Sequence, residues 1–236
     1  MTRNKGFSLI EGLLSMALTL LTAMAGLEAF SVSRRVYASL QKKEEAGRAA
    51  ACALDKMKSD LASSGEGLVR ELRLGDMKAV EGIAEGISIL SRGEGLSLAQ
   101  DAAGGQSAIL LGSTKELRAG QEVCLSGPGK AEMRVIAAVE GGRVVLSSPL
   151  AHSYETEEAD LCTVRRVSYF LDERTRIVRR RVNAGSAQPL LEGVSEFDCS
   201  FDEAGNLAVI KIRLRDDEEK TYEITYFPKN SGLAST

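Results

Sequence analysis

A chain of 236 residues is long enough for one domain of ordinary size beside a further segment. Its formal net charge of −3 provides no bulk field that would favour nucleic acid or anionic lipid. The content of 44% hydrophobic and 27% charged residues fits a folded domain and excludes a largely disordered chain. A single histidine, His152, argues against a histidine-based metal site, and we expect it in a surface loop.

The first residues join a basic leader to a long apolar run. Basic residues precede Gly6, the first acid of the chain is Glu11, and residues 7–30 are almost wholly apolar apart from Glu11 and Glu28. An ionisable group inside a membrane segment costs about 2.5–3.5 kcal/mol on insertion scales, so such a residue usually has a function and a partner. We expect this of Glu11, and we expect Glu28 to be solvated where the helix leaves the membrane.

This pattern differs from that of a secretory signal. A secretory signal has its small-residue cleavage site after an apolar stretch of about 7–15 residues. In this chain the plausible cleavage site, at Gly6, comes before the apolar run. Cleavage there would remove residues 1–6 as a leader and keep the apolar helix.

Residues 6–11, Gly-Phe-Ser-Leu-Ile-Glu, resemble the type III signal of the type IV pilin superfamily. The resemblance covers residues 1–30. It implies that prepilin peptidase cleaves between Gly6 and Phe7 and methylates the new amino group of Phe7. It also implies that Glu11 forms an assembly salt bridge with the amine of a neighbouring subunit. The alternative is a plain single-pass anchor with an incidental glutamate.

One long helix is predicted over residues 7–64. Its transmembrane half, residues 7–30, would be about 36 Å long and could cross a hydrocarbon core about 30 Å thick. The following residues 31–64 carry apolar side chains at every third or fourth position, which indicates an amphipathic helix. Gly65 follows as a candidate C-terminal cap.

The charges around the apolar run bear on its orientation. The basic leader favours a cytoplasmic N-terminus, although Arg34 and Arg35 on the far side oppose this. The pilin resemblance implies a cytoplasmic leader, so we expect a single-pass inner-membrane protein with a periplasmic domain, which later occupies the base or tip of a filament. Its expected partners are prepilin peptidase, the inner membrane, and other pilins or pseudopilins that contact the N-terminal helix.

Residues 65–236 are predicted to form a β-rich domain. Apolar and polar residues alternate in several short segments, such as 167–171, 208–214 and 222–226. This alternation is typical of an antiparallel sheet covered on one face, and the apolar stripe of the long helix is the expected cover. Closely spaced strand candidates at about 115–150 predict an inserted β hairpin or small barrel. The fold class is therefore α+β, and the resemblance implies a pilin-like arrangement.

Four cysteines are present, and none form the C-x-x-C pair that is typical of zinc or redox sites. Outside the cytoplasm disulfides are permitted, and four cysteines allow three complete pairings among which the sequence does not choose. We favour a disulfide between Cys124 and Cys162 because they flank one β-rich segment. Cys199 is expected to be a buried core thiol, and Cys52 to lie on the helix beside its apolar stripe.

Charged clusters are further candidate sites. Arg179–Arg181, with Arg165 and Arg166 nearby, could bind phosphate. No aromatic residues are interleaved among them, so we interpret them as a solvated strand face and expect no nucleic acid. Residues 216–219 and 155–160 are acidic but lack EF-hand spacing, so we expect turns and loops. Common hydrolase, metalloprotease and phosphate-loop motifs are absent from the sequence, and we expect no catalytic residue, cofactor or metal.

The expected function is that of a minor pilin, a low-copy structural or priming subunit of a type IV pilus-like filament, and not that of an enzyme. A large domain would crowd a repeating lattice, which favours the tip or an initiating complex over the shaft. The strand order in residues 162–228 is loosely similar to that of pseudopilin J proteins, so a type II secretion minor pseudopilin in a tip complex is an alternative. A more remote alternative is an unprocessed single-pass periplasmic binding or sensor domain.

Overall fold

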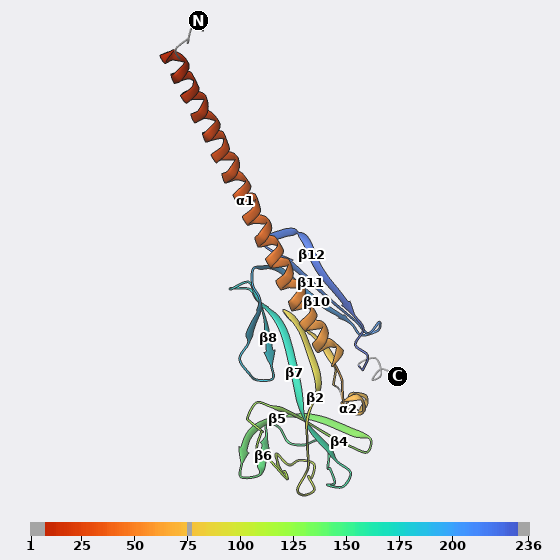
Figure 1. Ribbon diagram of the computed structural model, residues 1–236. Coiled ribbons are helices and arrows are strands. Elements are labelled where there is room, and N and C mark those ends of the chain that lie inside the picture. Colours follow the sequence, from red (N-terminus) through yellow and green to blue (C-terminus); the bar gives the residue numbers. More distant parts are fainter. Residues whose placement is uncertain (1–7, 75–76, 231–236) are drawn as a thin grey trace. The chain divides into compact units, whose positions relative to one another are not determined.

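The computed structural model describes residues 8–74 and 77–230 (Figure 1). The chain divides into two compact units, residues 1–48 and residues 49–236. A 54-residue helix, α1 (Leu9–Ala62), contributes to both units. The second unit also contains the short helix α2 (Val69–Leu74) and an antiparallel β domain. The fold class is therefore α+β, as expected.

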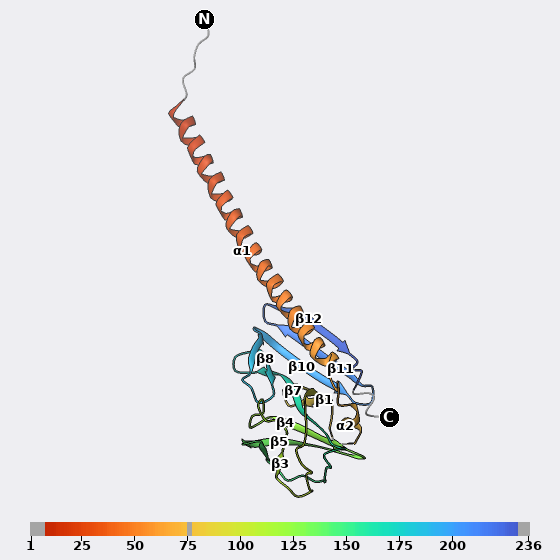
Figure 2. The same ribbon diagram turned by 60° about the horizontal axis from the view of Figure 1, so that its bottom comes forward.

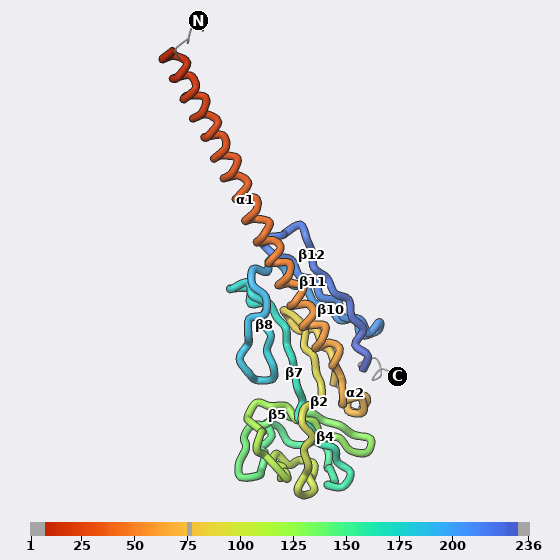
Figure 3. The backbone as a smooth tube through the Cα atoms, viewed as in Figure 1, coloured from red at the N-terminus to blue at the C-terminus, as the bar shows by residue number. Residues whose placement is uncertain are grey.

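The strands within the described residues form two sheets. The larger sheet has nine strands, β1 (Val80–Ile83), β2 (Gly86–Leu96), β3 (Ala108–Leu110), β4 (Glu122–Gly127), β5 (Lys130–Glu140), β6 (Arg143–Leu146), β7 (Asp160–Asp172), β8 (Ile177–Val182) and β9 (Gln188–Leu191). The smaller sheet has three, β10 (Val194–Asp202), β11 (Leu207–Leu214) and β12 (Asp217–Tyr226). Along the chain, β2 leads into β3, β4, β5 and β6, and β7 then runs back beside β2 (Figure 3).

Helix α1 changes character along its length. The large apolar side chains of residues 9–40 are exposed. From residue 50 onward one stripe is buried, and it comprises Ala50, Ala53, Leu54, Met57 and Leu61. Their spacing of three or four residues places them on one helix face. Figures 1 and 2 show these last turns running along the sheet formed by β10, β11 and β12.

The end of α1 is formed by a glycine turn. The helix ends at Ala62, two residues before the expected end. Gly65 has a φ of +66°, a conformation that glycine adopts without a steric penalty. Its backbone N–H donates to the carbonyl of Leu90 at 2.7 Å, which ties the turn to β2.

The smaller sheet has the alternation expected of a sheet covered on one side. Ala208, Ile210, Ile212 and Leu214 of β11 are at most 2% exposed. The opposite face carries polar residues joined across strands, including an ion pair of 2.7 Å between Arg213 and Glu196. Burial of four apolar side chains on the middle strand, at about 1.5–3 kcal/mol each, makes this face a main contributor to the stability of the domain.

Strand β7 organises the larger sheet because it pairs with three other strands. β2 pairs along one edge of β7, and the other edge is shared by β4 at residues 160–164 and β8 at residues 167–172. Asn183 bridges the junction. Its backbone N–H donates to the carbonyl of Arg166, and its side-chain oxygen accepts the N–H of Arg166, both at 2.7 Å. This satisfies the backbone of β7 where one partner strand ends and the other begins.

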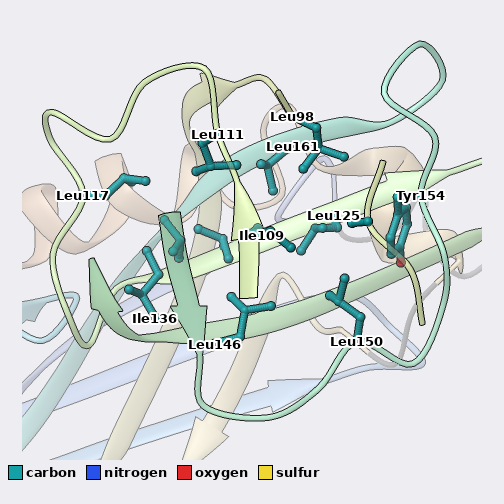
Figure 4. Close-up of a cluster of buried hydrophobic side chains, with 13 residues drawn as sticks. Leu98, Ile109, Leu111, Leu117, Leu125, Ile136, Leu146, Leu150, Tyr154 and Leu161 are labelled. Carbon is teal, nitrogen blue, oxygen red and sulfur yellow. The ribbon is translucent and has the colours of Figure 1, made fainter. Parts of the chain in front are cut away.

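A separate hydrophobic core lies among β3, β4, β5, β6 and the start of β7 (Figure 4). Its buried members run from Leu98 to Leu161 and include Leu125, Ile136 and Tyr154. This core extends beyond residues 115–150, the expected bounds of the insertion, at both ends. The reason is that the flanking loops also contribute, since Ala102 and Tyr154 form an isolated β bridge.

A buried carboxylate joins α1 to the larger sheet. Asp60, on the last turn of α1, is 4% exposed and accepts hydrogen bonds from the Tyr169 hydroxyl at 2.5 Å and from Arg180 Nε at 2.9 Å. Tyr169 and Arg180 are direct cross-strand partners on β7 and β8. Arg165 and Lys56 lie within 3.5 Å and 3.7 Å of the same carboxylate. A buried charge is tolerated here because several donors surround it.

We expect Asp60→Asn to lower the free energy of unfolding of the domain by about 3–5 kcal/mol, because it removes the buried charge that pairs with the half-buried Arg180. Urea denaturation followed by circular dichroism would measure this. Asp55→Asn, the same change at an exposed position of the same helix, is the matched control and should change stability by less than about 0.5 kcal/mol. Equal stability of the two variants would show that the network contributes nothing.

The same carboxylate predicts a pH dependence. Burial alone raises the pKa of Asp60, but hydrogen bonds from Arg180 and Tyr169 and the charges of Arg180 and Lys56 outweigh it, so the pKa lies below its ordinary value of 3.8. A lowered pKa contributes stability that is present above about pH 4 and is lost as the pH falls through the folded-state pKa. The stability difference between the wild type and Asp60→Asn should therefore shrink from pH 6 to about pH 3. A constant difference would contradict this assignment.

Candidate functional site

The candidate site is the start of the apolar helix. Gly6 and Phe7, the residues of the expected cleavage and methylation, lie outside the described residues. Glu11 lies in the first turn of α1 and is exposed. The backbone N–H of Ser8 donates to Glu11 Oε2 at 3.1 Å. The carboxylate is thus held at the very beginning of the helix.

This hydrogen bond is one half of a capping box, a feature that the sequence interpretation missed. In a capping box, Ser or Thr precedes the first helical residue, and Glu or Gln three residues later accepts the N–H of the capping residue. Ser8 and Glu11 have this spacing, and the helix begins at Leu9. The signal was visible in the sequence as S-x-x-E before an apolar run. Glu11 therefore has a role in capping its own helix as well as an expected role between subunits.

The two threonine side chains that follow Glu11 are satisfied within the helix. The Thr19 hydroxyl donates to the Ser15 carbonyl at 2.8 Å, and the Thr22 hydroxyl donates to the Leu18 carbonyl at 3.0 Å. Glu11, Ser15, Thr19 and Thr22 follow one another at three- and four-residue spacing, so they form a polar stripe on one face. Donors that bond to their own backbone are compatible with an apolar environment.

The composition of this helix makes it a candidate membrane span. Over its best 18-residue window the mean hydropathy is 1.7, and none of that window is buried in the protein. Within the described residues, α1 is the one helix that is both long enough and apolar enough to cross a membrane. Exposure of so many large apolar side chains requires another apolar partner, which lipid or neighbouring helices would provide.

The structure brings two of the cysteines together. Cys124 and Cys162 are direct partners on the neighbouring strands β4 and β7, and both are buried free thiols. Cys52 is exposed on α1, as expected. Cys199 shares a strand face with Phe197 and Phe201 but is half-buried, so it is more accessible than the core thiol we expected. The reason is that β10 is an edge strand of the three-stranded sheet, so only β11 flanks it within that sheet.

The arginines of β7 and β8 have partners within the protein. Arg166 forms a bidentate pair with Glu122 at 2.8 Å and 3.0 Å, and Arg179 pairs with Asp172 at 3.0 Å. Arg165 and Arg180 contact Asp60. The guanidinium of Arg181 lies 5.2 Å from the centre of the Phe170 ring. These contacts favour a structural role for the cluster over phosphate binding.

The remaining candidates form no evident site. His152 is exposed in the loop after β6, and its backbone N–H donates to Glu132 at 3.1 Å. The acidic residues 216–219 form the turn between β11 and β12 and the start of β12. Within residues 8–74 and 77–230, no group of three or more His, Cys, Asp or Glu side chains could hold a metal ion. An open polar hollow of about 650 Å³ lies on the insertion beside Gln100, Gln106 and Arg143, and these side chains are exposed.

Comparison with known proteins provides no family for this chain. No family model matches it, and no curated protein matches it. Among solved structures, the Gp54 tailspike of Acinetobacter baumannii bacteriophage AP22, in complex with A. baumannii capsular saccharide, is similar at 16% identity and a TM-score of 0.28 over 33% of this chain. The tailspike protein gp49 from Pseudomonas phage LKA1 is similar at 21% identity and a TM-score of 0.26 over 31% of this chain. Each likeness spans 15% of the tailspike chain, and neither carries an argument about this protein.

We expect Glu11→Ala to leave membrane insertion and the fold of the domain intact. Loss of the carboxylate removes an insertion cost of about 2.5–3.5 kcal/mol, which exceeds the roughly 1 kcal/mol lost with the helix cap. The buried stripe of α1 begins at Ala50, so the melting temperature of the domain should not change. Carbonate extraction of membranes and thermal denaturation in detergent would check both points. A release of the variant from the membrane would contradict the expectation.

Proposed function

We propose that this protein is a minor pilin, a low-copy structural or priming subunit of a type IV pilus-like filament. Prepilin peptidase would cleave it between Gly6 and Phe7 and methylate Phe7. The protein itself would catalyse no reaction. The processed chain would remain in the inner membrane through α1, with its β domain in the periplasm, until it joins other subunits through that helix.

The observation that carries this proposal is the position of Glu11. It is an exposed carboxylate in the first turn of a long apolar helix, and it follows a glycine and a phenylalanine at the spacing of the pilin signal. A carboxylate within lipid is stabilised by a cation, and the amino group of a processed neighbouring subunit would supply one at the same depth. Exposed apolar side chains on the faces of residues 9–40 outside the polar stripe that includes Glu11 provide surface for packing against neighbouring helices.

The size of the domain supports a low-copy position. Its larger sheet carries a hydrophobic core from Leu98 to Leu161, in addition to the buried cluster that includes Leu72 of α2. A subunit of this bulk would crowd a repeating shaft, so a place at the tip or in an initiating complex suits it better. A protein as abundant as the main filament subunit would contradict this part of the proposal.

The experiment that tests the function separates the two roles of Glu11. Gln at the same position can still accept the N–H of Ser8 in a capping box, but it has no charge. We expect both Glu11→Gln and Glu11→Ala to reduce co-assembly with partner subunits at least tenfold. Each variant loses the ion pair between subunits, and a loss of about 1.4 kcal/mol or more in binding free energy weakens association at least tenfold. The measurement is the fraction of protein that co-purifies with sheared filaments or with the membrane assembly complex.

Glu28→Gln is the matched control, since Glu28 is exposed on the same helix near the end of the apolar run. It should assemble as the wild type does. Assembly by Glu11→Gln, but not by Glu11→Ala, would assign Glu11 to helix capping alone. Normal assembly by both Glu11 variants would overturn the proposal and favour an unprocessed periplasmic binding or sensor domain.

A further inference from the structure

The strand register places two cysteines opposite one another in the second unit. β4 and β7 are antiparallel neighbours, and Cys124 is the direct partner of Cys162. Directly opposed residues of an antiparallel pair have Cα atoms about 4.5–5.5 Å apart. Disulfides require Cα atoms about 4.4–6.8 Å apart, so the spacing of directly opposed residues falls within the range that a bond requires.

Both thiols also point to the same side of the sheet. Cys124 and Cys162 belong to one buried cluster with Leu68, Leu72, Ala79, Leu90 and Val164. Each cysteine is 1% exposed, and Cys124 Sγ lies 4.0 Å from the thioether sulfur of Met77. An apolar cluster below α2 would accommodate a disulfide without any loss of polar contacts.

We propose that Cys124 and Cys162 form a disulfide that ties the inserted β segment to the strand about which the larger sheet is organised. This inference rests on the proposed function for one point, the location of the domain outside the cytoplasm, where disulfides persist. The oxidant is a protein disulfide of the thiol oxidoreductase class. One thiolate attacks that disulfide and releases one thiol, and the second thiolate then attacks the mixed disulfide and releases the other. Two electrons and two protons thus pass to the oxidant.

The bond must form before the strands are fully packed. Burial raises the pKa of both thiols, that of Cys162 to about 11, so few thiolates are available in the folded, reduced domain. Access by an oxidoreductase is also blocked at 1% exposure. Oxidation therefore accompanies folding, when β7 first meets β4. The bond closes a loop of about 40 residues that contains most of the inserted core, and cross-links of long loops restrict the unfolded chain most strongly.

Peptide mapping of the full chain from native membranes tests the inference. Free thiols are alkylated in denaturant with N-ethylmaleimide, and the protein is digested with trypsin without reductant. We expect residues 119–130 and 144–165, which hold Cys124 and Cys162, to appear as one linked species that separates on reduction. The peptides 49–56 and 182–211, with Cys52 and Cys199, should carry the alkyl group. Alkylation of both Cys124 and Cys162, or a link from either to another cysteine, would overturn the inference.

The same digest keeps this result distinct from the proposed function. A processed chain gives a peptide of residues 7–34 with a methylated N-terminus, whereas an unprocessed chain gives residues 6–34. A methylated peptide together with alkylated Cys124 and Cys162 would contradict the disulfide alone. A linked pair in a chain that still carries Gly6 would contradict the pilin proposal and leave the disulfide standing.

Stability provides a second measurement. Protein that is reduced in denaturant and refolded should melt roughly 8–16 °C below the oxidised protein. The length of the closed loop sets the expected stabilisation, and the size of the domain converts it into this difference in melting temperature. The double variant Cys124→Ala, Cys162→Ala should show no such dependence on reductant. Cys199→Ala is the control and should keep the full difference. An equal melting temperature for oxidised and reduced wild-type protein would contradict a disulfide at this position.

Discussion

The carboxylate of Asp60 accepts hydrogen bonds from the Tyr169 hydroxyl and the Arg180 guanidinium, and the other buried residues of α1 are apolar. Apolar packing alone tolerates small rotations and shifts of a helix, because one leucine can replace another at similar cost. A buried charge does not tolerate such movements. A shift of the helix by one residue rotates it by about 100°, which would take the carboxylate away from its hydrogen-bond donors. This contact therefore specifies how the last turns of α1 lie on β7 and β8.

The two parts of α1 obey opposite physical requirements. From Ala50 to Leu61 the helix is stabilised by the domain, which buries one stripe of it and pairs its one buried acid. Over residues 9–40 the large apolar side chains are exposed, and the hydroxyls of Thr19 and Thr22 bond to the backbone of the same helix. Such a segment is stable in lipid or against other apolar helices. The same continuous helix thus contributes both a candidate membrane span and a buried stripe of the folded domain.

Much of this fold could be predicted from the sequence, because the signals were local. Alternation located β11 and β12, and three- and four-residue spacing located the stripe of α1 that is buried from Ala50 on, although the predicted stripe began at residue 31. The helix ends at Ala62, two residues before the predicted end. The sequence interpretation missed α2 and β1, which span six and four residues and are too short to show a period. These elements depend on tertiary contacts.

The side chains singled out for function or for long-range contacts divide in the same way. Glu11 stands out in an apolar run, and the capping box with Ser8 could also have been found from spacing alone. Asp60 could not, since its partners Tyr169 and Arg180 lie 109 and 120 residues away in the chain. The favoured pairing of Cys124 with Cys162 was one of three that the sequence allowed, and only the register of β4 and β7 places them side by side. Long-range register is the information that local patterns lack.

The most direct test of the pilin account is the intact mass and N-terminal sequence of the protein purified from native membranes. Cleavage after Gly6 by prepilin peptidase predicts a chain that begins with N-methylated Phe7. That result would establish processing as a pilin and leave the identity of the filament as the next question. A mature chain that still begins at Met1, in cells that process their other pilins, would contradict the account and favour a membrane-anchored binding or sensor domain.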